Sequence, residues 1–285
     1  MRETAEAVFP ASAAGRGKIL CGIFFQKKIG GATSISRISR KITTMTRERA
    51  IRIELWQRME TAVQILAEGV CLQTELQYRM QLSGGAIDQL MKALLEEELI
   101  ERRFFGNGLT KYAVLRLTDN GVAFATELGC PIRKSEWDIL VQRHNAEEHS
   151  QHAFAVLLFA FQSRRRGWHV EVRPKVDNPL VEPDVLVEKD GERVYVEVEV
   201  LRHPRKRRDG ADNTWVRKWH NQYDFQGRVA VCTLTPRRMQ GIMRYFKPRW
   251  RGMATELTTL AKNPQSDLWL ERWEWPNEVS RWSLY

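Results

Sequence analysis

Two hydrophobic periods divide the chain into a helical part and a part rich in strands. Over residues 51–68 and again over residues 87–95, apolar side chains recur every three or four positions, which is the spacing of one buried helix face. The pattern predicts a helix over 51–68, a short helix over 74–80 and a third helix capped by Ser83. From residue 168 onward, apolar and polar residues alternate over short runs, as they do in half-buried strands.

The third predicted helix is followed by a predicted β-hairpin. Residues 99–105 and 111–117 flank the tip Gly106-Asn107-Gly108, whose residues favour a tight turn, and Thr118 opens a closing helix through Leu128. Three helices, a hairpin and a closing helix predict a winged helix-turn-helix over residues 50–128. The phrase LLEEELIERRFFGNGLTKYAVLRLTDNGVAFA is similar to that of many bacterial winged helices.

This predicted domain suggests contact with DNA. In a helix-turn-helix the recognition helix enters the major groove, while a wing follows phosphates. The candidate contacts are polar or basic: Ser83, Gln89 and Lys92 for bases, and Arg102, Arg103 and Lys111 for phosphates. The recognition helix ends in three consecutive glutamates, residues 96–98, and winged helices also serve as protein-interaction modules. Dimerisation or docking is therefore the alternative.

A second domain is predicted beyond the linker Gly129-Cys130-Pro131. Its elements follow the order helix, three strands, helix, strand, helix, over residues 135–166, 168–173, 184–187, 193–200, 214–225, 228–234 and 236–245. This αβββαβ order predicts an α/β (α+β) fold over residues 135–246, and the family resemblance given below implies that its central sheet is mixed.

Residues 182–200, EPDVLVEKDGERVYVEVEV, predict a hairpin that turns at Asp190-Gly191. On its second strand the valines point one way, while Glu197 and Glu199 point the other way, and Asp184 lies at the mouth of the first strand. Three carboxylates on neighbouring strands make an oxygen-rich pocket that suits Mg²⁺ or Mn²⁺. The alternative interpretation is a solvated strand face.

Pro183-Asp184 followed by Glu197-Val198-Glu199 resembles the PD-(D/E)xK motif of the restriction-endonuclease-like superfamily. The resemblance implies catalytic roles for Asp184, Glu197 and Glu199. It also implies that Asp184 and Glu197 hold Mg²⁺ or Mn²⁺, with the Val198 carbonyl as a further ligand. Glu199 stands where the family carries lysine, which leaves the enzymatic activity open.

The flanking helices carry candidates for the remaining residues of the motif. In some members of the superfamily the lysine migrates to the helix after the third strand, where Lys218 lies, so the resemblance implies that Lys218 is the catalytic lysine. The first helix often donates an acid, which implies Glu148 as a further metal ligand, with His152 as a polar neighbour.

Lys218 with Tyr223 resembles the K-x-x-x-x-Y spacing of the replication-relaxation proteins of plasmids and integrative elements, which also join a winged helix to this kind of domain. The resemblance implies a DNA-binding protein that acts in replication, relaxation or transfer. Its expected partners are double-stranded DNA and either a second copy or other replication or transfer proteins. One alternative is an active Mg²⁺-dependent endonuclease or nickase. Another is a transcriptional regulator or assembly factor with an inactive nuclease fold.

The net charge of +10 over 285 residues agrees with a nucleic-acid partner. Residues 1–44 carry eight Lys/Arg and two Asp/Glu, which leaves +4 for the remainder. We expect this segment to be a disordered basic leader, or a mis-annotated start upstream of Met45. A dense basic loop after the acidic strand is a candidate for phosphate contact through Arg205, Lys206, Arg207 and Arg208.

The C-terminal extension, residues 247–285, interleaves tryptophan with arginine. Such side chains pack back on a domain or, alternatively, stack on unpaired bases. The four cysteines are scattered without paired spacing, so we expect a reducing cytoplasm and neither a zinc site nor disulfides. No apolar run approaches transmembrane length, so no membrane partner is expected.

Overall fold

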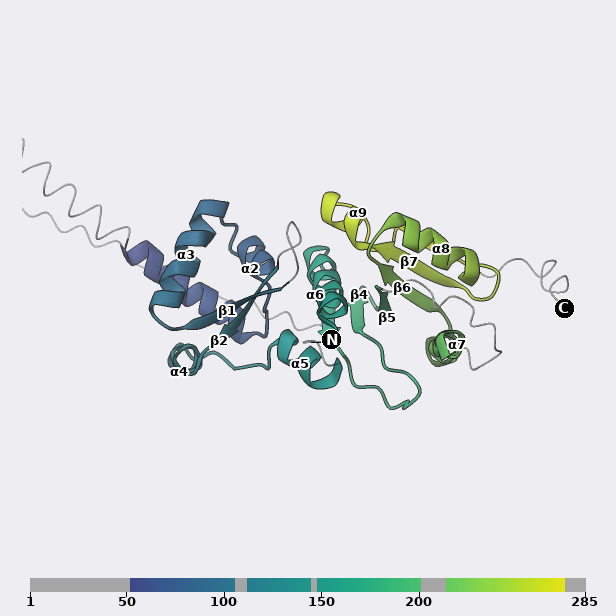
Figure 1. Ribbon diagram of the computed structural model, residues 1–285, viewed down its shortest axis with the longest axis horizontal. Helices are drawn as coiled ribbons and strands as arrows, with labels where there is room; N and C mark the ends of the chain where they lie inside the picture. Colours follow the sequence, from purple (N-terminus) through teal and green to yellow (C-terminus); the bar gives the residue numbers. More distant parts are fainter. Residues whose placement is uncertain (1–51, 106–111, 145–147, 201–213, 275–285) are drawn as a thin grey trace, which may run out of the picture. The chain divides into compact units, whose positions relative to one another are not determined.

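The computed structural model describes residues 52–105, 112–144, 148–200 and 214–274, which belong to one compact unit (Figure 1). The predicted leader, the wing tip, Lys111 and the basic loop at 205–208 lie outside the described residues. Within the described ranges, no helix has both the length and the apolar character needed to cross a membrane.

The N-terminal part is a winged helix, as predicted. A helix over residues 52–67 is followed by α2 (Gln73–Arg79) and α3 (Gly84–Glu96), then by the antiparallel strands β1 (Ile100–Phe105) and β2 (Tyr112–Leu117), and then by α4 (Asp119–Glu127). The core lies between the helices and the hairpin because the predicted apolar faces meet there. It includes Met59, Val63, Leu66, Ile87, Leu90 and Leu94.

Local sequence signals fix the first turns of α3 and α4, the helices that precede and follow the hairpin. Ser83 accepts a hydrogen bond from Ala86 N at 3.4 Å and caps α3, while Thr118 accepts one from Gly121 N at 3.0 Å and caps α4. Gly121 permits a close approach of two backbones, since a Cβ atom there would lie 2.0 Å from the Leu99 carbonyl oxygen. These capping and glycine positions place the closing helix directly against the wing.

The second part begins with two helices instead of the single long helix predicted over 135–166. They are α5 (Glu136–His144) and α6 (Ser150–Arg165). The following elements are β3 (His169–Val172), β4 (Val185–Lys189), β5 (Glu192–Glu199), α7 (Thr214–Gln226), β6 (Val229–Thr233) and α8 (Pro236–Phe246). From α6 to β6 this is the predicted αβββαβ order.

The sheet continues past residue 246, where the sequence analysis ends the domain. Strand β7 (Gly252–Glu256) pairs in parallel with β6, α9 (Leu257–Lys262) follows, and β8 (Glu271–Trp273) pairs antiparallel with β7. The strand order is β3-β4-β5-β6-β7-β8, with β5, β6 and β7 parallel. The tryptophans at 250 and 269 are buried, so this stretch of the extension packs back on the domain.

Helices cover both faces of the mixed sheet (Figure 1). The valine face of β5 packs on α6 and α9, within a core that includes Phe154, Leu157 and Phe159. The opposite face packs on α7 and α8, with Trp219 and Phe246 at its centre. The two acids on the second face of β5 therefore lie under a helix, and the solvated strand face considered above is wrong for Glu197.

A buried ion cluster joins the two parts of the described chain. The guanidinium of Arg164, on α6, donates to both carboxylate oxygens of Glu75, on α2, at 2.7 and 2.8 Å. It also donates to both oxygens of Glu136, on α5, at 2.7 and 3.0 Å. Cys71, Leu72 and Val114 of the winged helix share one apolar core with the second part.

Candidate functional site

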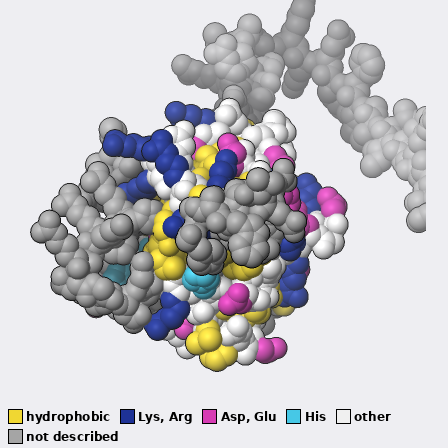
Figure 2. Space-filling view, turned by 90° about the vertical axis from the view of Figure 1, so that its right-hand side faces the viewer, with side chains coloured by type: hydrophobic (Ala, Val, Ile, Leu, Met, Phe, Trp, Pro, Cys, Tyr) yellow, Lys and Arg dark blue, Asp and Glu magenta, His cyan; other side chains and the backbone are white. Residues whose placement is uncertain are grey.

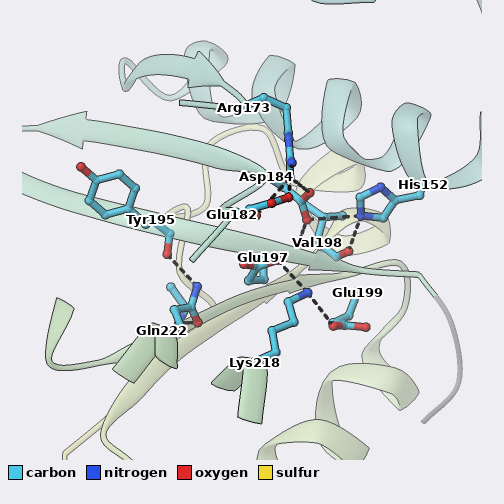
Figure 3. A network of polar contacts seen from close by, with 11 residues as sticks. His152, Arg173, Glu182, Asp184, Tyr195, Glu197, Val198, Glu199, Lys218 and Gln222 are labelled. Atoms are coloured by element: carbon cyan, nitrogen blue, oxygen red, sulfur yellow. Dashed lines mark hydrogen bonds and ion pairs between the residues drawn. The ribbon is translucent and has the colours of Figure 1, made fainter. Parts of the chain in front are cut away.

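The PD-(D/E)xK-like hairpin brings its first two acids side by side. Strands β4 and β5 pair with Val185 opposite Val196, so the next residues outward, Asp184 and Glu197, are neighbours. Both are almost fully buried, at 2 % and 3 % exposed. Burial of two carboxylates is costly unless each has a partner, and both have one (Figure 3).

Hydrogen bonds from three elements hold Asp184 in place. Its Oδ2 accepts from the backbone N–H of Val198 at 2.8 Å and lies 3.2 Å from Nε2 of His152. Its Oδ1 lies 3.4 Å from Nη1 of Arg173, which also donates to the Glu182 carbonyl oxygen at 3.0 Å. The orientation of Asp184 is thus set by α6, β5 and the residue after β3.

His152 binds a second acceptor in the same site. Its Nε2 lies 2.9 Å from the carbonyl oxygen of Val198, and a carbonyl can only accept, so Nε2 carries the hydrogen. The Val198 carbonyl, which the family resemblance assigns to a metal, therefore accepts from His152 here. A carbonyl oxygen has two lone pairs, so this hydrogen bond leaves the Val198 carbonyl able to bind a cation as well.

Lys218 provides a lysine side chain close to Glu199, the position at which the motif of the family has its lysine. The α7 helix directs its Nζ to 2.7 Å from Glu197 Oε2 and 3.2 Å from Glu199 Oε1 (Figure 3). The adjacent Trp219 is fully buried and anchors this turn of α7 against the sheet. Tyr223, the other residue of the K-x-x-x-x-Y spacing, is partly buried against the same core.

An open cavity of about 600 Å³ lies beside the acids and Lys218. His152, Asp184, Glu197 and Lys218 form its charged floor. The loop after Arg173 forms one wall and carries Leu180, whose carbonyl oxygen accepts from Asn221 of α7. Lys218 and the two buried carboxylates therefore line the same open cavity.

The two buried carboxylates have opposite pKa shifts. Burial alone would raise the pKa of Asp184, but the hydrogen bond and charge of His152 and the charge of Lys218 outweigh it and hold that pKa well below its usual value. Burial raises the pKa of Glu197 to about 7; Lys218 opposes this shift and the charge of Asp184 adds to it. The pKa of Lys218 is raised because its three carboxylate neighbours outweigh its burial.

A divalent cation fits the chemistry of this donor set in part. Asp184 and Glu197 offer hard oxygen ligands in a cavity, and Mg²⁺ commonly binds one or two carboxylates together with substrate phosphates. Glu148 is exposed and lines a different hollow, with Glu199 and Lys218. Among the described residues, no group of three or more His, Cys, Asp or Glu side chains is arranged to hold a metal. Any cation at this site would therefore rely on Asp184 and Glu197.

Two polar residues of the site are missing from the sequence prediction or were given a lesser place in it. Arg173 is buried, has a left-handed backbone with φ of +52°, and contacts Asp184 from the far side of the hairpin. Its φ and its contact depend on tertiary packing, so no local signal indicates them. His152 was considered only as a neighbour of Glu148, although the structure places it directly on Asp184.

The predicted DNA contacts of the winged helix lie on its surface. Ser83, Gln89, Lys92 and Arg103 are exposed, and Arg102 is partly exposed. The positive charge is partly compensated, because Lys92 lies 3.6 Å from Glu96 and Arg103 lies 3.6 Å from Glu101. Ser83 also has the capping role described above.

Comparison with known proteins gives little further information. No protein-family model matches the chain, and no curated protein matches it. A solved structure of a double mutant of Lactococcus lactis ZitR in apo form is similar to part of the chain, at 22 % identity and a TM-score of 0.24. The similarity covers 35 % of this chain and 72 % of that one.

Proposed function

We propose that the protein binds double-stranded DNA and brings a phosphodiester to the cavity formed by Asp184, Glu197 and Lys218. The observation that carries this proposal is the position of Lys218, whose Nζ lies within ion-pair distance of two acids on β5 while it faces the cavity. A lysine beside two carboxylates can contact a phosphate oxygen directly. The resemblance to replication-relaxation proteins supports a plasmid or mobile element as the setting.

The winged helix is the proposed part that finds the DNA. Gln89 and Lys92 are exposed on α3, the helix that enters the major groove in this class of fold. The wing strand β1 adds Arg102 and Arg103, and the Arg102 guanidinium lies 4.8 Å from the centre of the Phe104 ring. These side chains provide base and phosphate contacts on one small domain.

A second candidate function is metal-dependent cleavage of DNA, and the arrangement around Lys218 favours it. A bound Mg²⁺ or Mn²⁺ would be held by Asp184 and Glu197, and it would activate a water and neutralise charge on the phosphate. Lys218 would stabilise the negative charge that develops on the phosphate oxygens. His152 and Arg173 would keep the Asp184 carboxylate in a fixed orientation.

A supercoiled-plasmid assay with Mg²⁺ or Mn²⁺ tests both functions when it is combined with a gel shift on linear duplex. We expect metal-dependent nicking by the wild type and its loss in Asp184→Ala and in Lys218→Ala. Lys175→Ala is the matched control because Lys175 is exposed on the loop beside the cavity and does not line it.

The outcomes separate the candidate functions. Nicking that is lost in both site variants and kept in Lys175→Ala would establish a nuclease that uses the helix-borne lysine. A gel shift without nicking in either metal, unchanged in Asp184→Ala, would leave a DNA-binding regulator with an inactive nuclease fold. Absence of any gel shift by the wild type would refute the proposal of DNA binding.

A further inference from the structure

The outer face of α8 is strongly basic. The helix buries Met239, Ile242, Met243 and Phe246 against the sheet and exposes Arg237 and Arg244 on its other side. From residue 235 to residue 251 the sequence carries six Lys or Arg and no Asp or Glu. One face of this helix is therefore apolar and the other is positively charged.

Two of these charges are not compensated within the described part of the chain. Neither Arg237 nor Arg244 has an ion pair or hydrogen bond there, although both are exposed. Neighbouring basic residues have partners: Lys247 lies 3.5 Å from Glu271, and the Arg249 guanidinium lies 4.0 Å from the centre of the Tyr245 ring. Arg237 and Arg244 stand two turns apart, about 10 Å along the helix axis.

Gly241 lies between these two arginines on the exposed side of the helix. A glycine in the interior of a helix destabilises it relative to alanine. Nothing in the described part of the fold requires this one, because a Cβ atom at 241 would meet no atom of the described residues within 4 Å. A bare backbone flanked by two uncompensated arginines suits the close approach of a bulky anionic surface.

Helix α8 packs beside α7, the helix that carries Lys218. The two helices α7 and α8 lie on the same face of the sheet, where the rings of Trp219 and Phe246 are 4.6 Å apart. Arg238, at the start of α8, donates to the carbonyl oxygen of Val200, directly after the strand that bears Glu197 and Glu199. On this side of the molecule, several Lys and Arg side chains lie close together at the upper left of Figure 2.

We propose that the outer face of α8 is a second DNA-contact surface, which binds the phosphate backbone through Arg237 and Arg244 and guides the duplex toward the cavity. This inference rests on the proposed function, since it requires that the protein bind DNA. In this arrangement Gly241 lets the sugar-phosphate backbone approach the helix closely. The winged helix then reads the sequence, while α8 positions the DNA on the second domain.

The test compares DNA affinity and its salt dependence in the full-length protein, by fluorescence anisotropy with a labelled duplex. Each lost phosphate contact lowers the slope of log affinity against log salt by about 0.9. We therefore expect Arg237→Gln with Arg244→Gln to weaken binding about tenfold and to reduce that slope by about two. Arg193→Gln, on the exposed β4–β5 hairpin, is the control and should leave both quantities unchanged.

A variant at Gly241 tests the close approach of DNA independently of the two arginines. Gly241→Gln should raise the melting temperature, because glutamine favours helix and meets no neighbour, yet it should weaken DNA binding by blocking the approach. Gln240→Ala, at the adjacent exposed position, should leave DNA binding unchanged.

The outcomes distinguish this inference from the proposed function. If the wild type binds DNA and the double arginine variant binds with the same affinity and salt slope, the α8 surface is refuted while DNA binding stands. Unchanged binding by Gly241→Gln would refute the close approach. If the wild type does not bind DNA at all, the proposed function fails and the α8 surface fails with it.

Discussion

At the scale of single residues, the site pairs a carboxyl group that stays ionised with one that titrates near neutral pH. Asp184 accepts one hydrogen bond from the Val198 backbone N–H and contacts His152 and Arg173, so its charge is stabilised from several directions. Glu197 is equally buried and contacts Lys218, but burial still raises its pKa to about 7. Asp184 is therefore negatively charged at neutral pH, whereas Glu197 becomes negatively charged only as the pH rises through its pKa of about 7.

The raised pKa of Glu197 predicts a pH-dependent stability. A carboxyl group whose pKa is higher in the folded than in the unfolded state stabilises the fold at low pH and loses that contribution as pH rises through the folded pKa. Relative to Glu197→Gln, the wild type should therefore lose stability between about pH 4.5 and 7, by an amount on the order of 3 kcal/mol. Urea denaturation of both proteins at several pH values measures this. A difference in unfolding free energy that does not change with pH would contradict it.

Gly121 yields a prediction about close packing. A methyl group at this position would overlap the Leu99 carbonyl, 2.0 Å away, so Gly121→Ala must displace α4 or the wing. We expect a loss of on the order of 1–3 kcal/mol in unfolding free energy. Gly129→Ala is a useful comparison because its Cβ would meet nothing, although its positive φ of 73° also carries some strain. Gly121 has no positive φ, so an unchanged unfolding free energy in Gly121→Ala would contradict the overlap.

At the scale of elements, the buried cluster of Arg164 with Glu75 and Glu136 holds α2, α5 and α6 together. Removing one partner of a buried ion pair leaves uncompensated charge in the interior. Arg164→Ala should thus lower the unfolding free energy by about 3–5 kcal/mol. Arg165→Ala removes the next side chain on α6, which lies over the Tyr78 ring, and should cost much less. Similar losses in the two variants would show that the buried cluster has no special role.

The helices and strands differ in how far the sequence alone predicts them. The caps at Ser83 and Thr118 depend on residues three positions apart, so local reading finds them. The break between α5 and α6 was missed because polar residues there continue a helix-compatible pattern. Strand β7, with the sequence GMATE, has little strand character of its own and is defined by its parallel pairing with β6.

The same reasoning applies to the candidate site. Asp184 and Glu197 lie on one hairpin, and the motif spacing predicts that they meet. Lys218 was suggested only by resemblance, because it arrives through a crossover helix that no local pattern aligns with the acids. Arg173 was not predicted, since its contact with Asp184 depends on the pairing of β3 with β4 and on an unusual backbone angle.

At the scale of the whole molecule, the winged helix and the second domain share buried contacts and should unfold together. Cys71 belongs to the winged helix and Cys232 to β6, and both thiols are buried. In a background of Cys21→Ser and Cys130→Ser, thiol labelling of these two positions should begin at the same urea concentration. Labelling of Cys71 at clearly lower urea would show that the winged helix unfolds separately. Mass spectrometry of the labelled peptides distinguishes the two sites.

The position of Lys218 on α7 also determines when the site can be completed during synthesis of the chain. A growing polypeptide exposes its N-terminal parts first, and domains generally fold in that order during synthesis. The hairpin with Asp184 and Glu197 leaves the ribosome before residue 218, so both acids emerge before Lys218 does. The complete charge arrangement can form only once α7 has been made and has packed its buried Trp219 on the sheet. A truncated chain that ends before α7 would therefore carry the motif but not the site.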